Sequence, residues 1–578
     1  MEPAGLQFSL GHYRGVVEDA LRQARDQDVI QRIWNKDPSL WKSDEAHQKI
    51  IRNSLGWLNI AREMSAVTGE VVNFADEIRG PGGFSHVMLC GMGGSSLCPE
   101  VIRQTFGDQS GYPKLLVLDS TDPDVLESFA QQIDIDHCLF VIASKSGTTT
   151  EPLVFYKYWY DQVSQRSQTP GASFVAITDP GTRMVEMATE AKFRRVFLNR
   201  PDIGGRYSAL SYFGLVPAAL MGVDIGTLLK RAEEMARVCS AGSSPEGNSG
   251  ALLGAVVAEC AKAGRDKLTI VTDQSIASLG LWIEQLIAES TGKEGKGILP
   301  VNGEPLGPPS VYSDDRLFVS IGIGNLESEK DPALKNLEAA GHPVIYRLLK
   351  EPYDLGQEFY LWEFATAFAG WRLSINPFDQ PNVQESKDAT KELLDCFNRE
   401  GKLPEQSILV RDEVLTIYAD EKTRALLPSA SVTEALRGHL AQLKKHDYIA
   451  LLDYIEETAD IEAAVQEIRT QLRDVTGCAT TTGYGPRFLH STGQLHKGGP
   501  DSGVFIQLTA LDKVDLPIPG ESYTFSILKQ AQALGDFRAL ATRGRRAIRI
   551  DLGVDVVAGL HRLKDLIGFA LQKEAGAS

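Results

Sequence analysis

Cysteine is scarce in this chain, and the cysteines that are present form no recognisable pattern. Seven of them are scattered over 578 residues without a Cys-x-x-Cys pair, which disfavours both a disulfide framework and a structural zinc site. A His-Glu-x-x-His motif is also absent and the histidines are not clustered, so metal-dependent chemistry is disfavoured. We therefore expect a reduced, cytoplasmic protein that needs no metal and no other cofactor.

Long apolar runs and an excess of positive charge are absent as well. No run of about 18 apolar residues occurs, so we expect no membrane-spanning helix. The N-terminus lacks the basic and apolar regions of a signal peptide. With 59 lysines and arginines against 76 aspartates and glutamates, the formal charge is −17, which disfavours nucleic acids and anionic membranes as partners. An anionic small molecule would need a local group of basic side chains.

The chain is too long for a single core, so we expect several compact units. Residues 1–80 are patterned as helices and predict a helical arm, which a Gly-Pro-Gly-Gly sequence ends. Short apolar runs then alternate with helical stretches, which predicts an α/β fold with doubly wound, mostly parallel sheets. We assign residues 81–225 and 226–390 to two similar α/β domains, and residues 391–578 to a smaller C-terminal α/β unit. The expected strands are 86–90, 114–118, 138–143, 173–178, 195–198, 267–272, 317–321, 343–348, 414–418, 448–452, 504–508 and 547–551.

A loop rich in hydroxyl groups is the strongest functional signal. It reads Ser-Lys-Ser-Gly-Thr-Thr-Thr-Glu-Pro at residues 144–152, between the apolar run 139–143 and a helical run, 153–163. At such a strand-to-helix junction, backbone N–H groups, hydroxyl groups and the positive end of the helix dipole converge on an anion. The loop therefore predicts a binding site for a phosphate monoester on a small molecule.

A second turn, Gly-Met-Gly-Gly-Ser-Ser at residues 91–96, also joins an expected strand to an expected helix. A dinucleotide-binding fold would use such glycines for a pyrophosphate, with Asp119 at the end of the next strand contacting the ribose. That interpretation leaves the loop at 144–152 unexplained. A tight turn that binds no ligand is the other alternative.

Three charged side chains stand in contexts that suit catalysis. Arg206 follows two glycines, which let a ligand approach the backbone beside a fixed cation. Glu289 ends an apolar helical run, where desolvation favours a general base. Lys387 lies one turn into a helix that follows the proline-rich turn 376–382. For each of them the alternative is an ordinary solvated side chain.

Together these segments resemble the phosphoglucose isomerase family. The shared motifs are Gly-x-Gly-Gly-Ser, Ser-Lys-Ser-Gly-Thr-Thr, Gly-Gly-Arg-Tyr-Ser, Glu-Ser-x-Gly-Lys and Asp-Gln-x-x-Val-x-x-x-Lys, over residues 85–390. The resemblance implies two sugar-isomerase (SIS) domains. It also implies reversible isomerisation of glucose 6-phosphate and fructose 6-phosphate, a step of glycolysis and gluconeogenesis.

The wider chain, from Trp34–Lys42 to the tail, looks like the isomerase module of transaldolase–phosphoglucose isomerase fusions. No upstream segment has the length of a transaldolase barrel, so we expect isomerase activity alone. Association with a separate transaldolase stays open.

The resemblance also implies a role for individual residues. Glu289 passes a proton between C2 and C1 through a cis-enediol(ate), Arg206 stabilises the enediolate, and Lys387 assists ring opening. These roles agree with the chemistry, because aldose–ketose isomerisation needs one carboxylate base and a cation where the enediolate charge develops. The substrate-binding residues implied are Gly94, Ser95, Ser144, Lys145, Ser146, Thr148, Thr149, Gly205, Gln285 and Gln380.

One family motif is out of place. In the familiar isomerases, a Leu-His-Ser-x-Gly-Gln segment follows soon after Glu-Ser-x-Gly-Lys, and its histidine opens the sugar ring from the partner subunit. Here no histidine occurs between Lys293 and His342, and a match stands in the tail instead, at Phe488–Lys497. We predict that the segment is relocated and that His490 is the ring-opening acid/base, because imidazole titrates near neutral pH. The alternative is a histidine of an unrelated domain, and His496 is a weaker candidate.

Two further functions fit the same motifs. One is an isomerase that also accepts mannose 6-phosphate. The other is a SIS protein that binds phosphosugars without catalysis, which Glu289, Arg206 and Lys387 argue against. By resemblance we expect a homodimer, because the family builds its site across a subunit interface. If His490 acts in its own chain, the site depends less on a second subunit.

Overall fold

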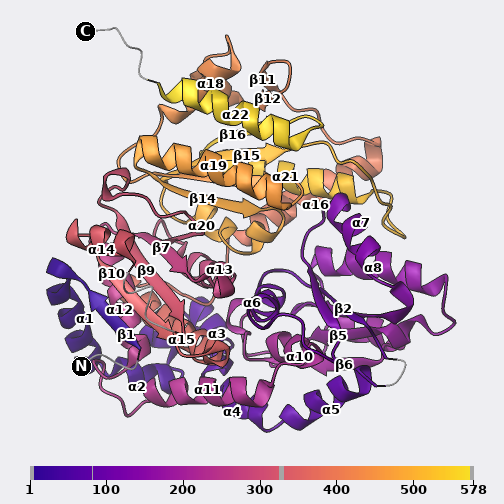
Figure 1. The fold of residues 1–578 in the computed structure, drawn as a ribbon, viewed down its shortest axis with the longest axis vertical. Helices are drawn as coiled ribbons and strands as arrows, with labels where there is room; N and C mark the ends of the chain where they lie inside the picture. Colours follow the sequence, from indigo (N-terminus) through magenta and orange to yellow (C-terminus); the bar gives the residue numbers. More distant parts are fainter. Residues whose placement is uncertain (1–4, 81–82, 325–330, 573–578) are drawn as a thin grey trace.

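The computed structural model describes residues 5–80, 83–324 and 331–572, which form three β-sheets with helices between them (Figure 1). The first sheet has the order β3-β2-β4-β5-β6, and all its pairs are parallel. The residues of its inner strands alternate between two hydrophobic clusters, as expected for a sheet covered on both faces. Its strands are β2 (His86–Cys90), β3 (Lys114–Leu118), β4 (Cys138–Ala143), β5 (Phe174–Thr178) and β6 (Arg195–Leu198). All five strands predicted for this region are confirmed.

Helices follow the strands of the first sheet in turn. They are α6 (Leu97–Phe106), α7 (Pro123–Gln132), α8 (Thr150–Ser164), α9 (Arg183–Glu190) and α10 (Tyr212–Leu220). The strand–helix alternation with parallel pairing confirms the predicted α/β class.

The second sheet has the order β1-β10-β9-β7-β8. The strands β7 (Lys267–Thr272), β8 (Leu299–Asn302), β9 (Arg316–Ile323) and β10 (Val344–Leu349) are parallel. Strand β1 (Leu6–Ser9) pairs antiparallel with β10 at the edge. The sequence analysis expected only helices over residues 1–80, and it missed β1 and β8 because a four-residue strand carries little periodicity.

The third sheet has the order β11-β12-β16-β15-β13-β14. Strands β13 (Tyr448–Tyr454), β14 (Ala479–Tyr484), β15 (Gly503–Thr509) and β16 (Arg546–Asp551) are parallel, and β11 (Ile408–Arg411) and β12 (Thr416–Tyr418) form an antiparallel edge. The expectation of a smaller C-terminal unit is wrong, because this sheet has six strands against five in each of the others. Its helices are α17 (Glu421–Leu426), α18 (Val432–Leu440), α19 (Ala459–Thr476), α20 (Gly493–Gly498), α21 (Phe525–Thr542) and α22 (Val556–Leu571).

Most of the remaining helices join the first two sheets into one body with a shared core, whereas the buried leucines of Pro332–Ala339 and Val383–Glu400 belong to other clusters. The remaining helices are α1 (Arg14–Asp26), α2 (Val29–Trp34), α3 (Glu45–Arg52), α4 (Ile60–Ser65), α5 (Thr68–Ile78), α11 (Ile225–Val238), α12 (Ser249–Lys262), α13 (Leu279–Thr291), α14 (Pro332–Ala339), α15 (Leu355–Leu373) and α16 (Val383–Glu400). None of the helices in the described part of the chain is long and apolar enough to span a membrane.

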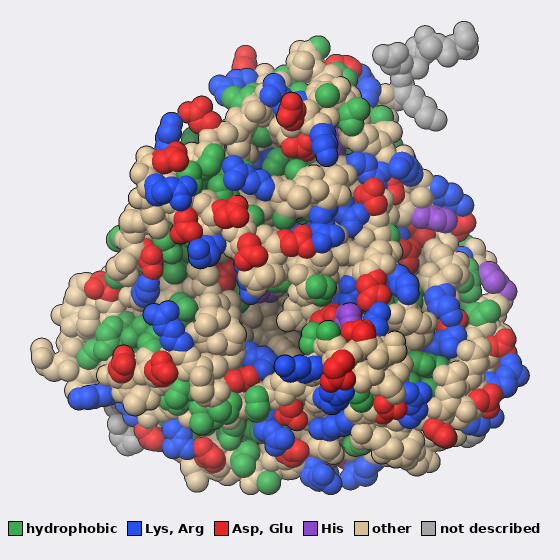
Figure 2. All heavy atoms as spheres, turned by 180° about the vertical axis from the view of Figure 1, so that it is seen from behind, with side chains coloured by type: hydrophobic (Ala, Val, Ile, Leu, Met, Phe, Trp, Pro, Cys, Tyr) green, Lys and Arg blue, Asp and Glu red, His purple; other side chains and the backbone are tan. Residues whose placement is uncertain are grey.

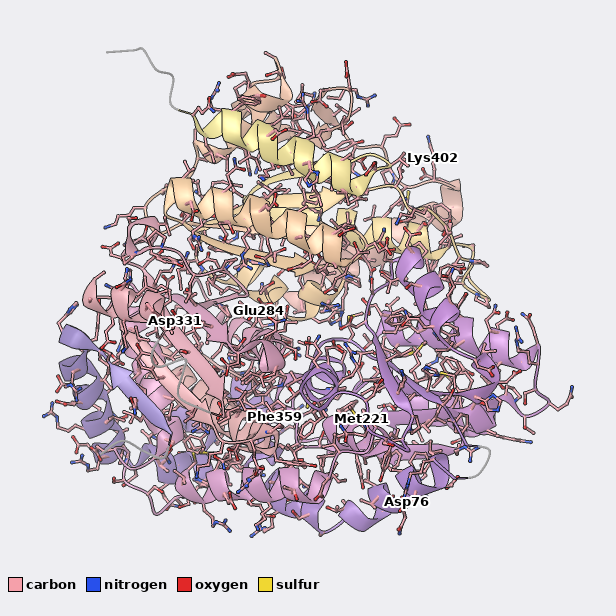
Figure 3. All side chains as sticks on the ribbon, viewed as in Figure 1. Asp76, Met221, Glu284, Asp331, Phe359 and Lys402 are labelled. Carbon is pink, nitrogen blue, oxygen red and sulfur yellow. The ribbon has the colours of Figure 1, made fainter. Side chains whose placement is uncertain are left out.

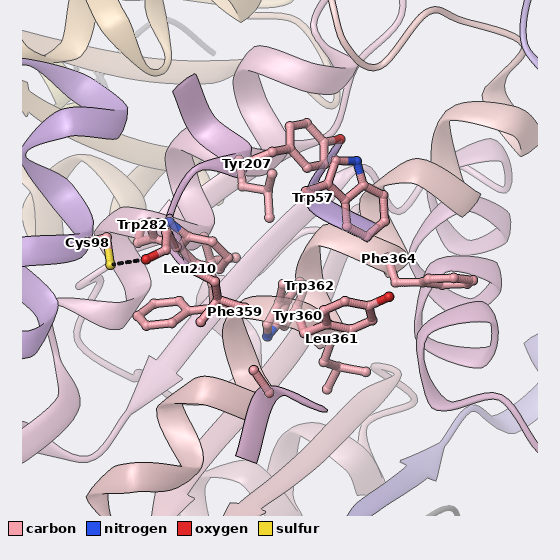
Figure 4. Packing of buried hydrophobic residues seen from close by; sticks show 14 of the residues in the cluster. Trp57, Cys98, Tyr207, Leu210, Trp282, Phe359, Tyr360, Leu361, Trp362 and Phe364 are labelled. Carbon is pink, nitrogen blue, oxygen red and sulfur yellow. Dashed lines mark hydrogen bonds between the residues drawn. The ribbon is translucent and has the colours of Figure 1, made fainter. Parts of the chain in front are cut away.

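Aromatic side chains around α15 fix the elements that carry the candidate site (Figure 4). The ring of Trp282, on α13, lies 4.9 Å from that of Phe359, on α15, and the rings of Trp57 and Tyr207 stack at 5.6 Å. Aromatic pairs at these separations add to the free energy gained by burying their surface. Because α13 carries Glu289 and Tyr207 adjoins Arg206, this core holds both charged groups in place.

The C-terminal unit docks on the first sheet through apolar side chains. Phe140 of β4 and Phe155 of α8 belong to the same buried cluster as Leu393 of α16 and Phe525 of α21. Phe155 and Phe525 stack with ring centroids 6.4 Å apart. Figure 2 shows the molecular surface hollowed where the C-terminal unit meets the other two sheets. The candidate site lies at this junction.

Candidate active site

The hydroxyl-rich loop lies between β4 and α8, at the carboxyl end of the first sheet. Gly147 has φ +65°, and a Cβ there would lie 2.8 Å from a threonine Cβ, so both the left-handed backbone and the lack of space require glycine. The Ser144 hydroxyl donates to Thr149 Oγ1 at 3.0 Å, and the Thr148 hydroxyl donates to Ser146 Oγ at 3.0 Å. The structure thus gathers four hydroxyl groups at the start of α8, a setting that suits a phosphate group.

Lys145 has a different partner from the one that the resemblance implies. Its ammonium forms a short ion pair with Asp179 Oδ2 and donates to the carbonyl oxygen of Pro201 at 3.1 Å. Burial keeps the pKa of Asp179 above its usual value even though Lys145 lowers it. A phosphate contact by Lys145 therefore stays a prediction, and it requires the lysine to exchange this carboxylate for the ligand.

The two glycine turns pack directly against each other. A Cβ on Gly94 would lie 2.1 Å from the carbonyl oxygen of Gly205, so only glycine lets the turns approach this closely. Gly93, with φ +55°, backs onto the relocated segment, since a Cβ there would lie 3.0 Å from the Cβ of His490. The hydroxyl of Ser95 donates to a backbone carbonyl within its own turn at 3.1 Å. The two turns thus pack together, and Gly93 brings the first turn beside His490.

Asp119, the acid of the dinucleotide alternative, is engaged elsewhere. It is buried, and its Oδ2 accepts a hydrogen bond from Arg487 Nε at 3.0 Å. Arg487 also donates to Glu457 Oε2 at 2.7 Å. Asp119 therefore helps to dock the C-terminal unit on the first sheet, and this engagement argues against a ribose contact.

Arg206 and Glu289 form a buried ion pair at the centre of the site. Arg206 Nη1 lies 3.3 Å from Glu289 Oε1, and the two residues are 3% and 8% exposed. These fractions exclude the solvated alternatives for both side chains. The guanidinium is fixed further by Ser290 Oγ at 2.7 Å, the carbonyl oxygen of Pro377 at 2.7 Å and Gln380 Oε1 at 3.0 Å. A cation held this rigidly is pre-organised to stabilise developing negative charge.

Gln285 connects the carboxylate to the relocated segment. It precedes Glu289 by one helical turn on α13, and its Nε2 donates to Glu289 Oε2 at 3.1 Å. The same nitrogen donates to the backbone carbonyl of His490 at 2.8 Å. One amide thus contacts both the predicted base and the segment that carries the predicted ring-opening group.

His490 and Lys387 line one cavity of about 450 Å³. Thr148, Thr149 and Glu151 of the hydroxyl-rich loop line the same cavity. His490 ends a short helix (Arg487–His490) that follows β14, at the carboxyl end of the third sheet. It belongs to the same chain as every other group in the cavity. The structure therefore places the relocated segment against the candidate site.

Glu151 is a residue that the sequence analysis missed. Its Oε1 lies 3.4 Å from His490 Nε2 and accepts a hydrogen bond from Gln532 Nε2 at 2.8 Å. Burial alone would raise the pKa of Glu151, but the His490 imidazole and the Lys387 ammonium hold that pKa below its usual value. A carboxylate in this position orients the imidazole. The signal was present, because Glu151 closes the hydroxyl-rich loop.

His496, the weaker histidine candidate, lies away from this cavity. It is 2% exposed, and its Nδ1 is 2.8 Å from the hydroxyl of Tyr448. Burial and the neighbouring Lys497 lower the pKa of His496 well below its usual value. These contacts make it part of the packing of α20 on the third sheet.

Comparisons with known proteins show which sequences this chain is similar to. The sequence model described as phosphoglucose isomerase matches residues 58–298. The glucose-6-phosphate isomerase of Carboxydothermus hydrogenoformans is 26% identical over 415 residues, which cover 61% of this chain and 87% of that protein. The one from Methanocaldococcus jannaschii is 26% identical over 346 residues, which cover 54% of this chain and 85% of that protein.

Two solved structures share the fold. A hypothetical protein of Thermus thermophilus superposes with a TM-score of 0.56 at 21% identity, covering 67% of this chain and 99% of that one. A glucose-6-phosphate isomerase of Chlamydia trachomatis superposes with a TM-score of 0.51 at 20% identity, covering 67% of this chain and 86% of that one. At these identities the two structures show a likeness of fold.

Proposed function

We propose that this protein interconverts glucose 6-phosphate and fructose 6-phosphate, as the names of its relatives indicate. The observation that carries the proposal is the buried pair of Glu289 and Arg206, 3.3 Å apart. Gln285 connects this pair to His490, which lines one cavity with Thr148 and Thr149 of the hydroxyl-rich loop. A protein that only binds phosphosugars needs the loop but not a buried carboxylate held beside a fixed cation. The pair therefore favours catalysis over simple binding.

In the isomerisation step Glu289 takes the proton from C2 of the open-chain aldose. The electron pair left on C2 forms a cis-enediol(ate), whose oxygen charge the Arg206 guanidinium stabilises. The hydroxyl proton on O2 then passes to O1, and Glu289 returns its proton to C1, which gives the ketose and regenerates the carboxylate. The phosphate group, held by Ser144, Ser146, Thr148 and Thr149, keeps C1 and C2 near the base. The proton and the electron pair stay within the substrate and the base.

Ring opening is the proposed task of His490 and Lys387. One of them accepts the proton of the C1 hydroxyl group while the other donates a proton to the ring oxygen as the C1–O5 bond breaks. Glu151 orients the imidazole through its contact at 3.4 Å. The contacts of Gln285 and Gly93 with His490 lie within one chain, so we propose that each chain supplies its own ring-opening group.

Four further proposals concern the roles of the flanking segments, the cellular location, the oligomeric state and the partners. We propose that residues 391–578 complete the site, that the residues before 81 brace the two SIS-type units, and that the protein is cytoplasmic. A homodimer fits the resemblance, but the proposed site is complete without a second chain. Association with a transaldolase, and use of mannose 6-phosphate, are tested by copurification and by the assay below.

The test is a coupled assay of the purified protein on both hexose phosphates, with mannose 6-phosphate in parallel. Turnover of glucose 6-phosphate should fall by about 100-fold or more in Glu289→Gln, a typical contribution of a general base. The exposed Glu294 gives the matched control, since Glu294→Gln should leave turnover unchanged. If Glu289→Gln still exchanges the C2 hydrogen with solvent at the wild-type rate, Glu289 is not the base. Binding of the sugar phosphates without turnover in the wild-type protein would favour the non-catalytic function.

A further inference from the structure

A second cavity of about 450 Å³ lies between the second sheet and the C-terminal unit. It opens at the carboxyl ends of β7 and β8 and reaches α19 and β14. The lining includes Ser278, Glu284, Glu304 and Arg469. Figure 3 labels Glu284 where the C-terminal unit meets the second sheet. Among the described residues, none of the proposed catalytic side chains lines this cavity, so it is distinct from the sugar-phosphate site.

Arg469 brings an incompletely bonded cation to this cavity. It is 1% exposed, and its Nε and Nη2 donate to the carbonyl oxygen of Thr480 at 3.0 and 2.8 Å. Its Nη1 has no hydrogen-bond partner within the described ranges. This nitrogen is itself buried beside Gly303, where a Cβ would lie 3.7 Å from it. A buried charged donor without an acceptor is costly, so this nitrogen calls for an acceptor in the cavity.

A second buried donor stands at the start of α13. Ser278 is 3% exposed, directly precedes this 13-residue helix and makes no side-chain capping bond. Its hydroxyl has no partner in the part of the chain that the structure describes. The positive end of the helix dipole adds to the attraction for an anion at this point.

Four carboxyl groups line the cavity, and three of them, Glu284, Glu304 and Glu457, are protonated or paired with an arginine. Burial raises the pKa of Glu284 to about 8, so this carboxyl is protonated at neutral pH and can donate a hydrogen bond. Glu304 pairs with Arg316 at 3.0 Å, and Glu457 pairs with Arg487 at 2.7 Å.

Two lining groups keep their own bonds, as the hydroxyl of Tyr484 donates to Glu462 Oε2 at 2.9 Å and Gln466 Nε2 donates to the same carboxylate at 2.8 Å. Within the described residues of the lining, the buried side-chain atoms without a partner are two donors, Arg469 Nη1 and the Ser278 hydroxyl, and one acceptor, Gln466 Oε1.

We propose that this cavity is an effector site for a small metabolite that carries an oxyanion, held by Arg469 Nη1, the Ser278 hydroxyl and the Glu284 carboxyl. The oxyanion is a carboxylate or a phosphate, which share the acceptor chemistry that these donors require. Phe488 and Ser491, on either side of the His490 turn, line the same cavity. An occupant thus contacts the segment that positions the ring-opening group, and this coupling rests on the proposed function.

Binding is measured without reference to activity. The sugar-phosphate loop is disabled by Ser144→Ala with Lys145→Ala, and the full-length protein is titrated by calorimetry with inorganic phosphate and with citrate as the two probes. We expect saturable binding of one probe, weakened about tenfold or more by Arg469→Gln, the usual effect of losing a hydrogen bond to a charged group. Arg424→Gln, at an exposed arginine, is the matched control. Absence of saturable binding for both probes, or unchanged affinity in Arg469→Gln, overturns the site.

Ser278→Ala guards against a folding defect in the arginine variant, because the hydroxyl it removes has no partner within the described residues. It should weaken the same probe severalfold and leave the melting temperature without probe unchanged. Coupling is then tested with otherwise wild-type enzyme. The bound probe should change turnover of cyclic glucose 6-phosphate, and Arg469→Gln should remove that change. A probe effect that is equal in the wild-type enzyme and in Arg469→Gln overturns the coupling. Absence of isomerase activity in the wild-type protein would refute the proposed function and leave the binding result standing.

Discussion

Mixing two inactive variants reports which chain supplies His490. Glu289→Gln removes the base and His490→Ala removes the ring-opening group, and each should lower turnover of cyclic glucose 6-phosphate by about 100-fold or more. In the structure, one amide nitrogen of Gln285 contacts Glu289 Oε2 at 3.1 Å and the His490 carbonyl at 2.8 Å, all within one chain. Every site in a mixed population therefore lacks one of the two groups, and the mixture should show only the mean of the two residual activities.

A crossed arrangement predicts a different number. If His490 reached the site of a neighbouring chain in a symmetric dimer, random pairing would make about half of the dimers mixed, each with one intact site, and about a quarter of wild-type turnover would return. The two variants are coexpressed in equal amounts, purified together without separating the species, and assayed with a coupled dehydrogenase. Recovery near a quarter would refute supply within one chain.

The reciprocal mixture tests the same arrangement from the opposite direction. Wild-type chains mixed equally with the double variant Glu289→Gln/His490→Ala should keep about half of the wild-type turnover when each chain completes its own site, and about a quarter when the histidine crosses between chains. Both outcomes are well above the activity of the double variant alone. Agreement between the two mixtures excludes an artefact of poor chain exchange.

Three further predictions concern single residues. His490→Ala should lower turnover far more on cyclic glucose 6-phosphate than on substrate supplied in the open-chain form. The control His137→Ala, at an exposed histidine, should change neither rate. Equal losses on both substrates in His490→Ala would remove the ring-opening role. Glu284→Gln should stabilise the protein increasingly between about pH 5 and pH 8, because burial raises the pKa of Glu284 from 4.5 to about 8 and the folded state holds a proton that the unfolded state has released. The gain should rise by at most about 1.4 kcal/mol per pH unit and level off above pH 8 in urea unfolding, and a gain independent of pH would contradict it. Gly147→Ala should raise KM for the sugar phosphate and lower stability, because φ is +65° and the new Cβ would lie 2.8 Å from a threonine side chain. Gly181 has φ +74° and open space around it, so Gly181→Ala should lose only the about 1–2 kcal/mol of stability that a left-handed backbone costs a residue with a Cβ. Equal losses of stability in the two variants would show that the contact between the new Cβ at position 147 and the threonine is unimportant.

The sheets could be predicted to different degrees, for a physical reason. Each strand of the first sheet is a short apolar run between helices, and such runs identify strands buried on both faces. Strand β14 reads Ala-Thr-Thr-Thr-Gly-Tyr and was missed, because threonine and glycine also mark loops. Thr480 of this strand is buried, and its hydroxyl donates to Glu304 Oε1 at 3.0 Å, in the loop that follows β8. A partner so distant in the chain leaves no local signal.

Within the site, the groups that depend on residue type and short spacing were visible in the sequence. The hydroxyl-rich loop, the glycine turns, Arg206 and Glu289 belong to short motifs. The structure packs the glycine turns against each other and pairs Arg206 with Glu289, and the loop lines a cavity with His490. Glu151 was overlooked although it closes one of these motifs, because its task depends on an imidazole that arrives from the third sheet. The partner of Lys145 was equally invisible, since Asp179 follows a different strand of the first sheet.

By itself, the sequence determined the α/β class and the chemical character of the site, because apolar runs and loop hydroxyl groups act through their immediate neighbours. Only the tertiary structure decided that His490 meets the amide of Gln285, 205 residues earlier in the chain. That meeting depends on the C-terminal sheet docking on the first one through Phe155, Phe525 and the residues around them. Docking of this kind reflects the complementarity of two folded surfaces, which no local stretch of sequence expresses.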